Sequence, residues 1–411
     1  MWLTNLRLPG QKDPRSLHIR DGKIFAITPS NPDNAAPHYS QSAEGASSPQ
    51  NPDAAGAPRN PDEPTLSFDN DLVFPGLINS HDHLDFNLFP ALANTRYHNY
   101  RDWGWDIHKK NKTEISEILK IPQPLRILWG IYKNLLNGFT TVVNHGEWLD
   151  TKDAPVTVHQ QCHNLHSIGF ERNWRWKLNR PTKTNWPYVL HVGEGTDITA
   201  HHEITQLIKW NLFRRPLIGI HGVAMTKEQA AHFQALIWCP ASNYFLLGQT
   251  APIGKLKSHL PILFGTDSTL TGPWDCWSQI RLARQEQALT DQELLQSLTT
   301  SPAAAWGLTD RGQLEKGKLA DLVIARPHNN TNSWDDFYNS SPDDLLLVIS
   351  RGNIVLFDPS LKETLTKAGL IGNNFHQAGP NGKYVPGDIS GLMKEIRSYY
   401  PAVQFPHQTS G

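Results

Sequence analysis

Hydrophobic and polar positions follow different patterns in successive parts of the chain. Residues 1–30 alternate apolar and polar side chains, as in the stretch LHIR at 17–20, and an Asp-Gly pair at 21–22 follows as a hairpin turn. This alternation predicts short antiparallel strands. Residues 31–64 are rich in Pro, Asn, Ala, Ser and Gly and have almost no large apolar side chains. They bury too little surface to offset their ordering entropy, so we predict a mobile loop.

Between about residues 72 and 306, short apolar runs alternate with stretches of helical periodicity. Several of the runs are apolar on both faces, as parallel strands covered by helices on each side are. The strand candidates are 73–78, 140–144, 188–192, 216–221, 236–239 and 261–264, and the helix candidates include 113–120, 124–137, 204–212 and 291–299. A repeated alternation of this length predicts an α/β fold, either a barrel or a doubly wound sheet.

The chain returns to strand-like runs after residue 309. These runs are predicted to complete the sheet that begins at the N-terminus, and a helix is predicted near the end of the chain, at 390–399. The predicted division is therefore an N-terminal part of a small β-sandwich (1–72), a barrel (73–308), and a C-terminal part of the sandwich with the terminal helix (309–411).

Composition narrows the class of protein. A length of 411 residues suits a large barrel with a satellite domain. The formal net charge of −1 gives no basic surplus for nucleic acid. No apolar run approaches the roughly 20 residues of a membrane helix, and no signal peptide begins the chain. The three cysteines are far apart and odd in number, which argues against a disulfide framework. We therefore expect a cytoplasmic protein that contacts neither nucleic acid nor membrane.

Five of the apolar runs are followed by a histidine or an aspartate. The residues that follow them are His81-Asp82-His83, Asn144-His145-Gly146-Glu147, His191-Val192-Gly193-Glu194, His221-Gly222 and Gly265-Thr266-Asp267. In a (β/α)8 barrel, chemistry takes place at the carboxyl ends of the strands. Two histidines separated by one residue point the same way from an extended chain, so both can reach one metal ion. Each motif alone also fits a structural histidine or a capping aspartate, but their joint placement favours a metal site.

Five motifs, in this order, resemble the amidohydrolase superfamily. They are FPGLINSHDHLD (74–85), HVGE (191–194), GIHG (219–222), CPASNYFLLGQTAPI followed by FGTDS (239–253 and 264–268), and GQLEKGKLADLVI (312–324). The fourth motif is most similar to the aminohydrolase branch, which includes cytosine, guanine and S-adenosylhomocysteine deaminases and triazine hydrolases. The resemblance spans about 65–325. It implies a (β/α)8-type TIM barrel plus a small β-sandwich built from both termini.

The resemblance also implies one divalent metal ion, zinc, with iron or manganese as alternatives. The implied ligands are His81, His83, His191 and Asp267. No lysine stands at a plausible fourth-strand end to bridge a second metal ion. Among the implied catalytic residues, Glu194 carries a proton, His221 orients water or substrate, and Asp267 accepts the proton of the water. One departure is that only some twenty polar, Trp- and Arg-rich residues precede His191, which predicts a shortened fourth unit.

The predicted reaction is hydrolytic attack on a C=N or C(=O)–N carbon. A divalent ion lowers the pKa of bound water toward about 7 and so supplies hydroxide at neutral pH. The leading hypothesis is an aminohydrolase of a small heterocycle that releases ammonia or an amine. The alternatives are a hydrolase of a cyclic amide, an amidine or a C–halogen bond, and, more remotely, a non-catalytic binding or assembly protein.

Substrate binding is predicted for aromatic and polar residues near the first and last strands. Aromatic faces can sandwich a flat ring, although such residues can equally pack the loops down. The candidates are Arg101, Trp103, Trp105, Asn243 and Trp274. The expected partner is a small-molecule substrate, and a homo-oligomer is a weaker expectation that rests on the resemblance.

Overall fold

The computed structural model describes residues 1–30, 63–328, 333–379 and 382–406. The predicted mobile loop, 31–64, lies outside the described residues except for its last two positions. The described strands form a nine-stranded, a five-stranded and a three-stranded sheet. Among the described helices, none has the length and apolar character that a membrane crossing requires.

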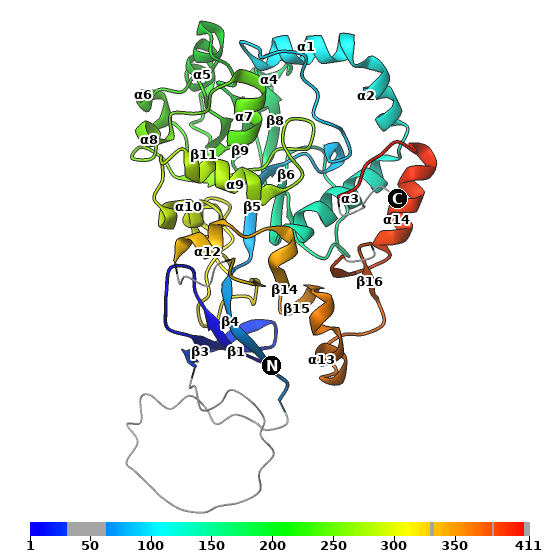
Figure 1. The fold of residues 1–411 in the computed structure, drawn as a ribbon. Coiled ribbons are helices and arrows are strands. Elements are labelled where there is room, and N and C mark those ends of the chain that lie inside the picture. Colours follow the sequence, from blue (N-terminus) through cyan, green and yellow to red (C-terminus); the bar gives the residue numbers. More distant parts are fainter. Residues whose placement is uncertain (31–62, 329–332, 380–381, 407–411) are drawn as a thin grey trace, which may run out of the picture.

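The nine-stranded sheet combines both ends of the chain, as predicted. Its neighbouring strands are antiparallel except for β1 and β4, which are parallel. In spatial order the strands are β16 (Phe375–Gln377), β17 (Tyr384–Pro386), β15 (Asn353–Phe357), β14 (Leu345–Ser350), β13 (Leu322–Ala325), β4 (Thr65–Pro75), β1 (Trp2–Arg7), β2 (Arg15–Arg20) and β3 (Lys23–Pro29). Figure 1 shows this sheet at the end of the molecule away from most helices.

The other two sheets are parallel. The three-stranded sheet contains β5 (Leu77–Asp82), β6 (Phe139–Asn144) and β7 (Thr157–His159), and the five-stranded sheet contains β12 (Ile262–Phe264), β11 (Ala235–Trp238), β10 (Leu217–His221), β9 (Tyr188–Val192) and β8 (His163–Ser167). Every residue of β5, β6, β9 and β10 is buried. This burial explains why these strands are apolar on both faces. The bounds of β6, β9 and β10 agree with the predicted runs to within one residue, whereas the predicted run 73–78 is divided between the end of β4 and the start of β5.

Helices surround the parallel strands (Figure 1). The α-helices are α1 (Tyr100–Lys110), α2 (Lys112–Leu119), α3 (Gln123–Leu136), α4 (Trp174–Asn179), α5 (Ile198–Trp210), α6 (Lys227–Ala230), α7 (Pro240–Leu247), α8 (Ile253–Leu256), α9 (Cys276–Gln285), α10 (Asp291–Ser297), α11 (Thr300–Ala305), α12 (Trp334–Tyr338), α13 (Lys362–Lys367) and α14 (Ile389–Tyr399). Short 3-10 helices are η2 (Leu84–Phe86), η3 (Pro342–Asp344) and η4 (Pro359–Leu361). The terminal helix α14 packs against α3, far from it in sequence.

The alternation of strand and helix is interrupted between β7 and β8. These strands are separated by only three residues, 160–162, and no helix lies between them. The stretch of about 155–170, which the sequence suggested as a single third-strand candidate, is therefore two strands. The Trp- and Arg-rich segment that follows forms α4, only six residues long. A shortened unit is present, and the missing helix belongs to the connection before β8.

The nine-stranded sheet leads directly into the candidate site. Strand β4 ends at Pro75 and β5 begins at Leu77, so only Gly76 separates them. A Cβ atom at Gly76 would lie 2.2 Å from the Thr140 hydroxyl oxygen, which only the absence of a side chain avoids. The close approach holds the start of β5 against β6.

Candidate active site

The predicted metal ligands lie at the carboxyl ends of parallel strands. His81 belongs to the end of β5 and His83 follows it; His191 lies in β9, and Asp267 follows β12. The amides of Thr266 and Asp267 both donate to the carbonyl oxygen of His81, at 3.2 and 3.0 Å. These bonds join the ends of β5 and β12, so ligands far apart in sequence converge.

Short distances connect the candidate ligand atoms. The Nε2 atoms of His83 and His191 are 3.4 Å apart, and Oδ1 of Asp267 lies 3.6 Å from Nε2 of His81. Two sets of ligand atoms lie within 4.8 Å of one another: His81 with His83 and His191, and His81 with His221 and Asp267. Both ring nitrogens of His81 are buried without a hydrogen-bond partner. Three imidazoles and one carboxylate suit zinc or a similar divalent ion, so the residues present fit a metal.

Further hydrogen bonds orient these side chains. Nδ1 of His191 lies 2.8 Å from the carbonyl oxygen of His166, which directs Nε2 toward the cluster. The Ser242 and Thr271 hydroxyls each donate to Oδ2 of Asp267 at 2.9 Å, so Oδ1 remains toward the histidines. Asp267 adopts a left-handed backbone conformation, with φ of 55°. Such conformations are uncommon outside glycine and cluster at functional sites.

Burial sets the protonation of the cluster. It lowers the pKa of His81 to about 4 and that of His191 well below the usual value, and neighbouring histidines add to both effects. Neutral imidazole is the form that binds metals. Burial alone would raise the pKa of Asp267, but the nearby His81 ring, 3.6 Å away, and the charges of His83 and His221 hold it well below its ordinary range. The site therefore combines neutral His81 and His191 with an ionised Asp267 carboxylate.

Glu194 and His221 lie beside the cluster, as predicted for catalytic residues. Oε1 of Glu194 is 3.6 Å from Nε2 of His221, and both side chains are buried. Burial and the charges of Asp267 and Glu203 raise the pKa of Glu194 well above its usual value. Nδ1 of His221 lies 2.8 Å from Oδ1 of Asn243, an acceptor that keeps the proton on Nδ1 and leaves Nε2 facing Glu194.

The cluster opens into a small cavity of about 70 Å³. Trp103, one of the predicted substrate-binding residues, lines it. Phe86 and Tyr100 also line it and belong to the aromatic residues near the first strand for which the sequence predicts a role in specificity. The sequence did not assign His166, Phe170, Leu270 or Thr271 to the site. His145 was noted in the sequence but given no role; it is buried with its ring centroid 4.7 Å from that of His191. Its position after an apolar run was the one signal available in the sequence.

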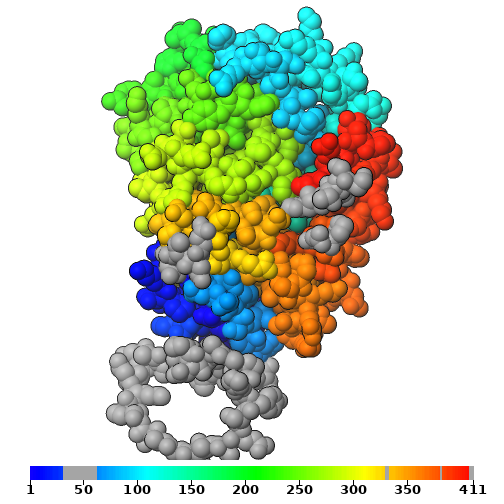
Figure 2. Space-filling view, in the orientation of Figure 1, coloured from blue at the N-terminus to red at the C-terminus, as the bar shows by residue number. Residues whose placement is uncertain are grey.

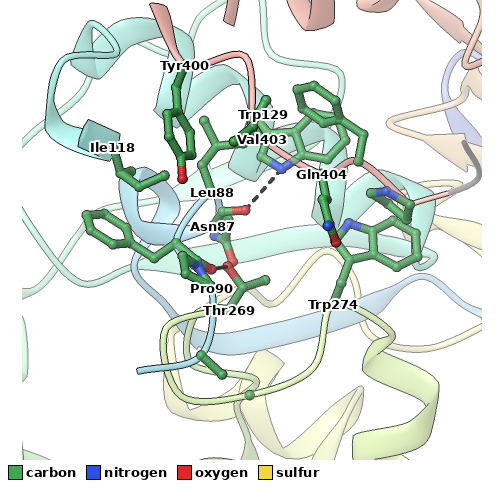
Figure 3. A pocket seen from close by; sticks show the side chains of 16 residues that line it. Asn87, Leu88, Pro90, Ile118, Trp129, Thr269, Trp274, Tyr400, Val403 and Gln404 are labelled. Carbon is green, nitrogen blue, oxygen red and sulfur yellow. Dashed lines mark hydrogen bonds between the residues drawn. The ribbon is translucent and has the colours of Figure 1, made fainter. Parts of the chain in front are cut away.

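The other four predicted substrate-binding residues do not line this cavity. Trp105 is 65% exposed on α1, and the Arg101 guanidinium pairs with Glu203. Asn243 lies behind His221, where it can position that imidazole. Trp274 lines a separate cavity of about 530 Å³ between the loops after β5 and β12 and the C-terminal segment 400–406 (Figure 3). For Arg101 and Trp105, side-chain direction explains the difference from Trp103, because α1 turns successive residues toward different neighbours.

A buried polar network lies next to the ligands. The Lys133 ammonium, on α3, donates to Oδ2 of Asp82 at 3.2 Å, to the Thr266 hydroxyl at 3.3 Å and to the carbonyl oxygen of Asp267 at 3.4 Å. The Asn134 amide also donates to Asp82, at 2.8 Å. The Lys133 and Asp82 side chains are fully buried. The network thus ties α3 to both strand ends that carry ligands.

Comparisons with known proteins found one family model and several similar curated proteins. The Amidohydrolase family model matches residues 171–356. A 5-methylthioadenosine/S-adenosylhomocysteine deaminase of Pyrococcus furiosus is 26% identical over 232 residues, which cover 50% of this chain and 52% of the relative. The same enzyme of Caldicellulosiruptor saccharolyticus is 30% identical over 184 residues, which cover 40% of this chain and 42% of the relative. The chain thus matches about half the length of these curated relatives.

Solved structures match over more of the chain. An adenosine deaminase from Xanthomonas campestris with bound zinc has a TM-score of 0.63 at 17% identity and covers 97% of both chains. An atrazine chlorohydrolase from Arthrobacter aurescens, complexed with zinc, has a TM-score of 0.62 at 16% identity and covers 90% of this chain and 99% of its own. These likenesses concern the fold. In sequence, residues 171–356 are similar to the Amidohydrolase family, and about half of the chain is similar to the two deaminases.

Proposed function

We propose that the protein is a metal-dependent hydrolase that cleaves a carbon–nitrogen bond of a small heterocyclic substrate and releases ammonia or an amine. The observation that carries this proposal is the convergence of four candidate ligands, with Glu194 and His221 beside them at the wall of one cavity. The two curated relatives described above are deaminases by name, which supports an aminohydrolase activity.

We further infer that the two parallel sheets form one (β/α)8-type barrel. Contacts between β12 and β5, and the backbone bonds to His81, support closure on one side. The nine-stranded sheet would correspond to the predicted β-sandwich. The division into 1–72, 73–308 and 309–411 stays a proposal, as do a cytoplasmic location and a homo-oligomeric state.

In this proposal, His81, His83, His191 and Asp267 hold one divalent ion, preferably zinc. When bound, such an ion polarises water and the carbon under attack. Hydrolysis adds water across the C–N bond: oxygen bonds to carbon, and protons pass to the departing nitrogen. Glu194, whose surroundings favour its protonated form, is placed to deliver that proton. Nε2 of His221 faces the same space and, with the proton on Nδ1, can accept a hydrogen bond that orients water or substrate.

The cavity walls suggest a flat substrate. Phe86, Trp103 and Phe170 contribute aromatic surface, and the volume of about 70 Å³ is far below the usual range for ligand sites. The loop after β5 would therefore have to move to admit a bicyclic ring. Amino-substituted purines and pyrimidines are the first compounds to test, because the curated relatives act on adenosine derivatives by name.

A second candidate is hydrolysis of a carbon–halogen bond at the same site. The likeness to the zinc-complexed atrazine chlorohydrolase favours it, since one fold serves both leaving groups. The two activities differ in product: a chloro-substituted triazine would release chloride without ammonia.

Metal content and product release test the proposal together. We expect purified protein to hold about one zinc, iron or manganese ion per chain by elemental analysis, and His83→Ala to lose it. His202→Ala, a change of a histidine outside the candidate site, is the matched control and should retain the metal. Wild type should then release ammonia from an amino-substituted heterocycle. No metal after reconstitution, or equal metal in His83→Ala and wild type, would refute the proposed site.

A further inference from the structure

The Trp- and Arg-rich segment singled out in the sequence has no role in the candidate active site. Together with the turn after α5 it forms a surface that we call the basic aromatic surface, defined as residues 171–183 and 209–215. These twenty positions hold eight Lys or Arg residues and one acidic residue, Glu171, in a chain of formal net charge −1. The positive charge is therefore concentrated here. Helices α4 and α5 lie in the half of the molecule away from the nine-stranded sheet (Figures 1 and 2).

The two segments of this surface contact each other directly. The Asn179 amide donates to the carbonyl oxygen of Trp210 at 2.8 Å, and the amide of Leu212 donates to Oδ1 of Asn179 at 3.1 Å. The Arg175 guanidinium lies over the Trp210 ring, 4.9 Å from its centroid, and that of Arg180 lies 5.7 Å from Trp176. Aromatic rings and cationic groups thus alternate across one continuous face.

A rigid turn presents two apolar side chains at this face. Leu212 is 64% exposed and Phe213 is 63% exposed. The side chain of Asn211 bonds to both backbone groups of Arg215, at 2.8 Å each, and so closes the turn. Arg214 has a left-handed φ of 48°. The turn therefore has a strained backbone and exposes two large apolar side chains to water. Neither feature stabilises the folded state, which indicates a role in binding.

We propose that the basic aromatic surface docks the protein on an anionic lipid bilayer, contrary to the sequence-based expectation of no membrane contact, which rested on the absence of a spanning segment. Leu212 and Phe213 would enter the boundary between headgroups and acyl chains. Exposed tryptophans such as Trp176 would lie at the headgroup level, and the surrounding Lys and Arg side chains would pair with anionic headgroups. An anionic bilayer offers both an apolar interior for Leu212 and Phe213 and negatively charged headgroups for the Lys and Arg side chains. A two-fold contact between copies would instead place like charges against one another.

Vesicle flotation of the full-length protein tests the proposal. We expect binding to vesicles of phosphatidylcholine with 30% phosphatidylglycerol, weak binding to pure phosphatidylcholine, and release in high salt. The double variant Leu212→Ser/Phe213→Ser should weaken binding by at least about tenfold. Leu119→Ser, at another residue that is 51% exposed, is the matched apolar control and should bind like wild type.

Charge reversal tests whether the basic side chains of this surface contribute to binding. Arg172→Glu and Lys183→Glu should each weaken binding by roughly fivefold, while Lys109→Glu, at an exposed residue of α1, should leave it unchanged. Unfolding temperatures of the variants should match wild type. No binding to anionic vesicles, equal binding to both compositions, or full binding by the serine double variant would overturn the proposal. So would a wild-type dimer that this variant converts to a monomer, which would make the surface a self-contact. None of these readouts depends on hydrolysis.

Discussion

At the scale of single residues, Glu194 has a carboxyl group in surroundings that favour its protonated form. It is buried, and the carboxylates of Asp267 and Glu203 add to the effect of burial. A raised pKa suits a group that must give a proton near neutral pH. The same surroundings have a cost in stability, because an ionised Glu194 is better solvated in the unfolded chain.

The variant Glu194→Gln separates these two effects. We expect kcat to fall by about 10²- to 10⁴-fold, since the amide cannot transfer a proton. Metal content should be unchanged. In metal-free protein at pH 7, the free energy of unfolding should rise by about 0.5–2 kcal/mol. The folded pKa is raised, so wild-type stability should fall as pH rises from the unfolded pKa of about 4.3 toward the folded pKa.

Urea denaturation across this pH range measures the effect on stability. The variant should lack the decline that wild type shows. Glu363→Gln, at a carboxylate that is 79% exposed, is the matched control and should change stability by less than about 0.5 kcal/mol. A parallel decline in wild type and Glu194→Gln would show that Glu194 is not the group responsible.

At the scale of elements, α3 holds together the two strand ends that carry ligands. Gly130 lets α3 approach the loop after β5, because a Cβ there would lie 2.1 Å from the carbonyl oxygen of Leu84. One helical turn away, Lys133 bonds to Asp82 and to the backbone of Asp267. Burial would lower the pKa of Lys133, but the charge of Asp82 raises it above its usual value. The pair is therefore a fixed connection between α3 and the site.

Removal of this connection should be costly. Lys133→Met leaves the Asp82 carboxylate buried without its cation, so we expect a loss of about 3–5 kcal/mol in the free energy of unfolding. The double variant Lys133→Met/Asp82→Asn should recover part of it. The surface pair of Lys120 and Glu117 offers a matched control, and Lys120→Met should cost at most about 1 kcal/mol. Equal losses at both lysines would contradict this account.

Most of the strands and helices could be predicted from the local pattern of apolar and polar residues. Strand β9 has the predicted bounds, 188–192, because five consecutive apolar or ligand residues are buried on both faces. The break between β7 and β8 was not predicted. Residues 160–162 are Gln-Gln-Cys and contain no proline or glycine, so nothing local marked the turn there.

At the scale of the whole molecule, the candidate site draws on ligands from residue 81 to residue 267. A metal ion that binds these residues would bind only the folded chain, because the unfolded chain does not bring them together. Ligand binding of this kind stabilises the folded state by mass action. We therefore expect the stability of the parallel sheets to depend on the ion.

Calorimetry with and without zinc tests this coupling. Free zinc at 1,000 times the dissociation constant should add about 4 kcal/mol to the free energy of unfolding and raise the unfolding temperature by several degrees. The chelated protein should unfold at the lower temperature. His83→Ala should show no zinc-dependent shift, whereas His202→Ala should respond like wild type. An identical shift in both variants would place the stabilising ion elsewhere.

The sequence by itself determined which residues could serve as ligands and which runs become buried strands. The candidate ligands stand directly after or within apolar runs: His81, His83, His191 and Asp267. This local pattern was sufficient to predict that they share one site. The tertiary structure alone decided what surrounds them. Trp103 reaches the cavity while Trp105, two residues away, faces solvent, and His145 joins the cluster. Side-chain direction depends on how helices and loops pack around the strands, and packing between distant segments leaves no mark in a local pattern.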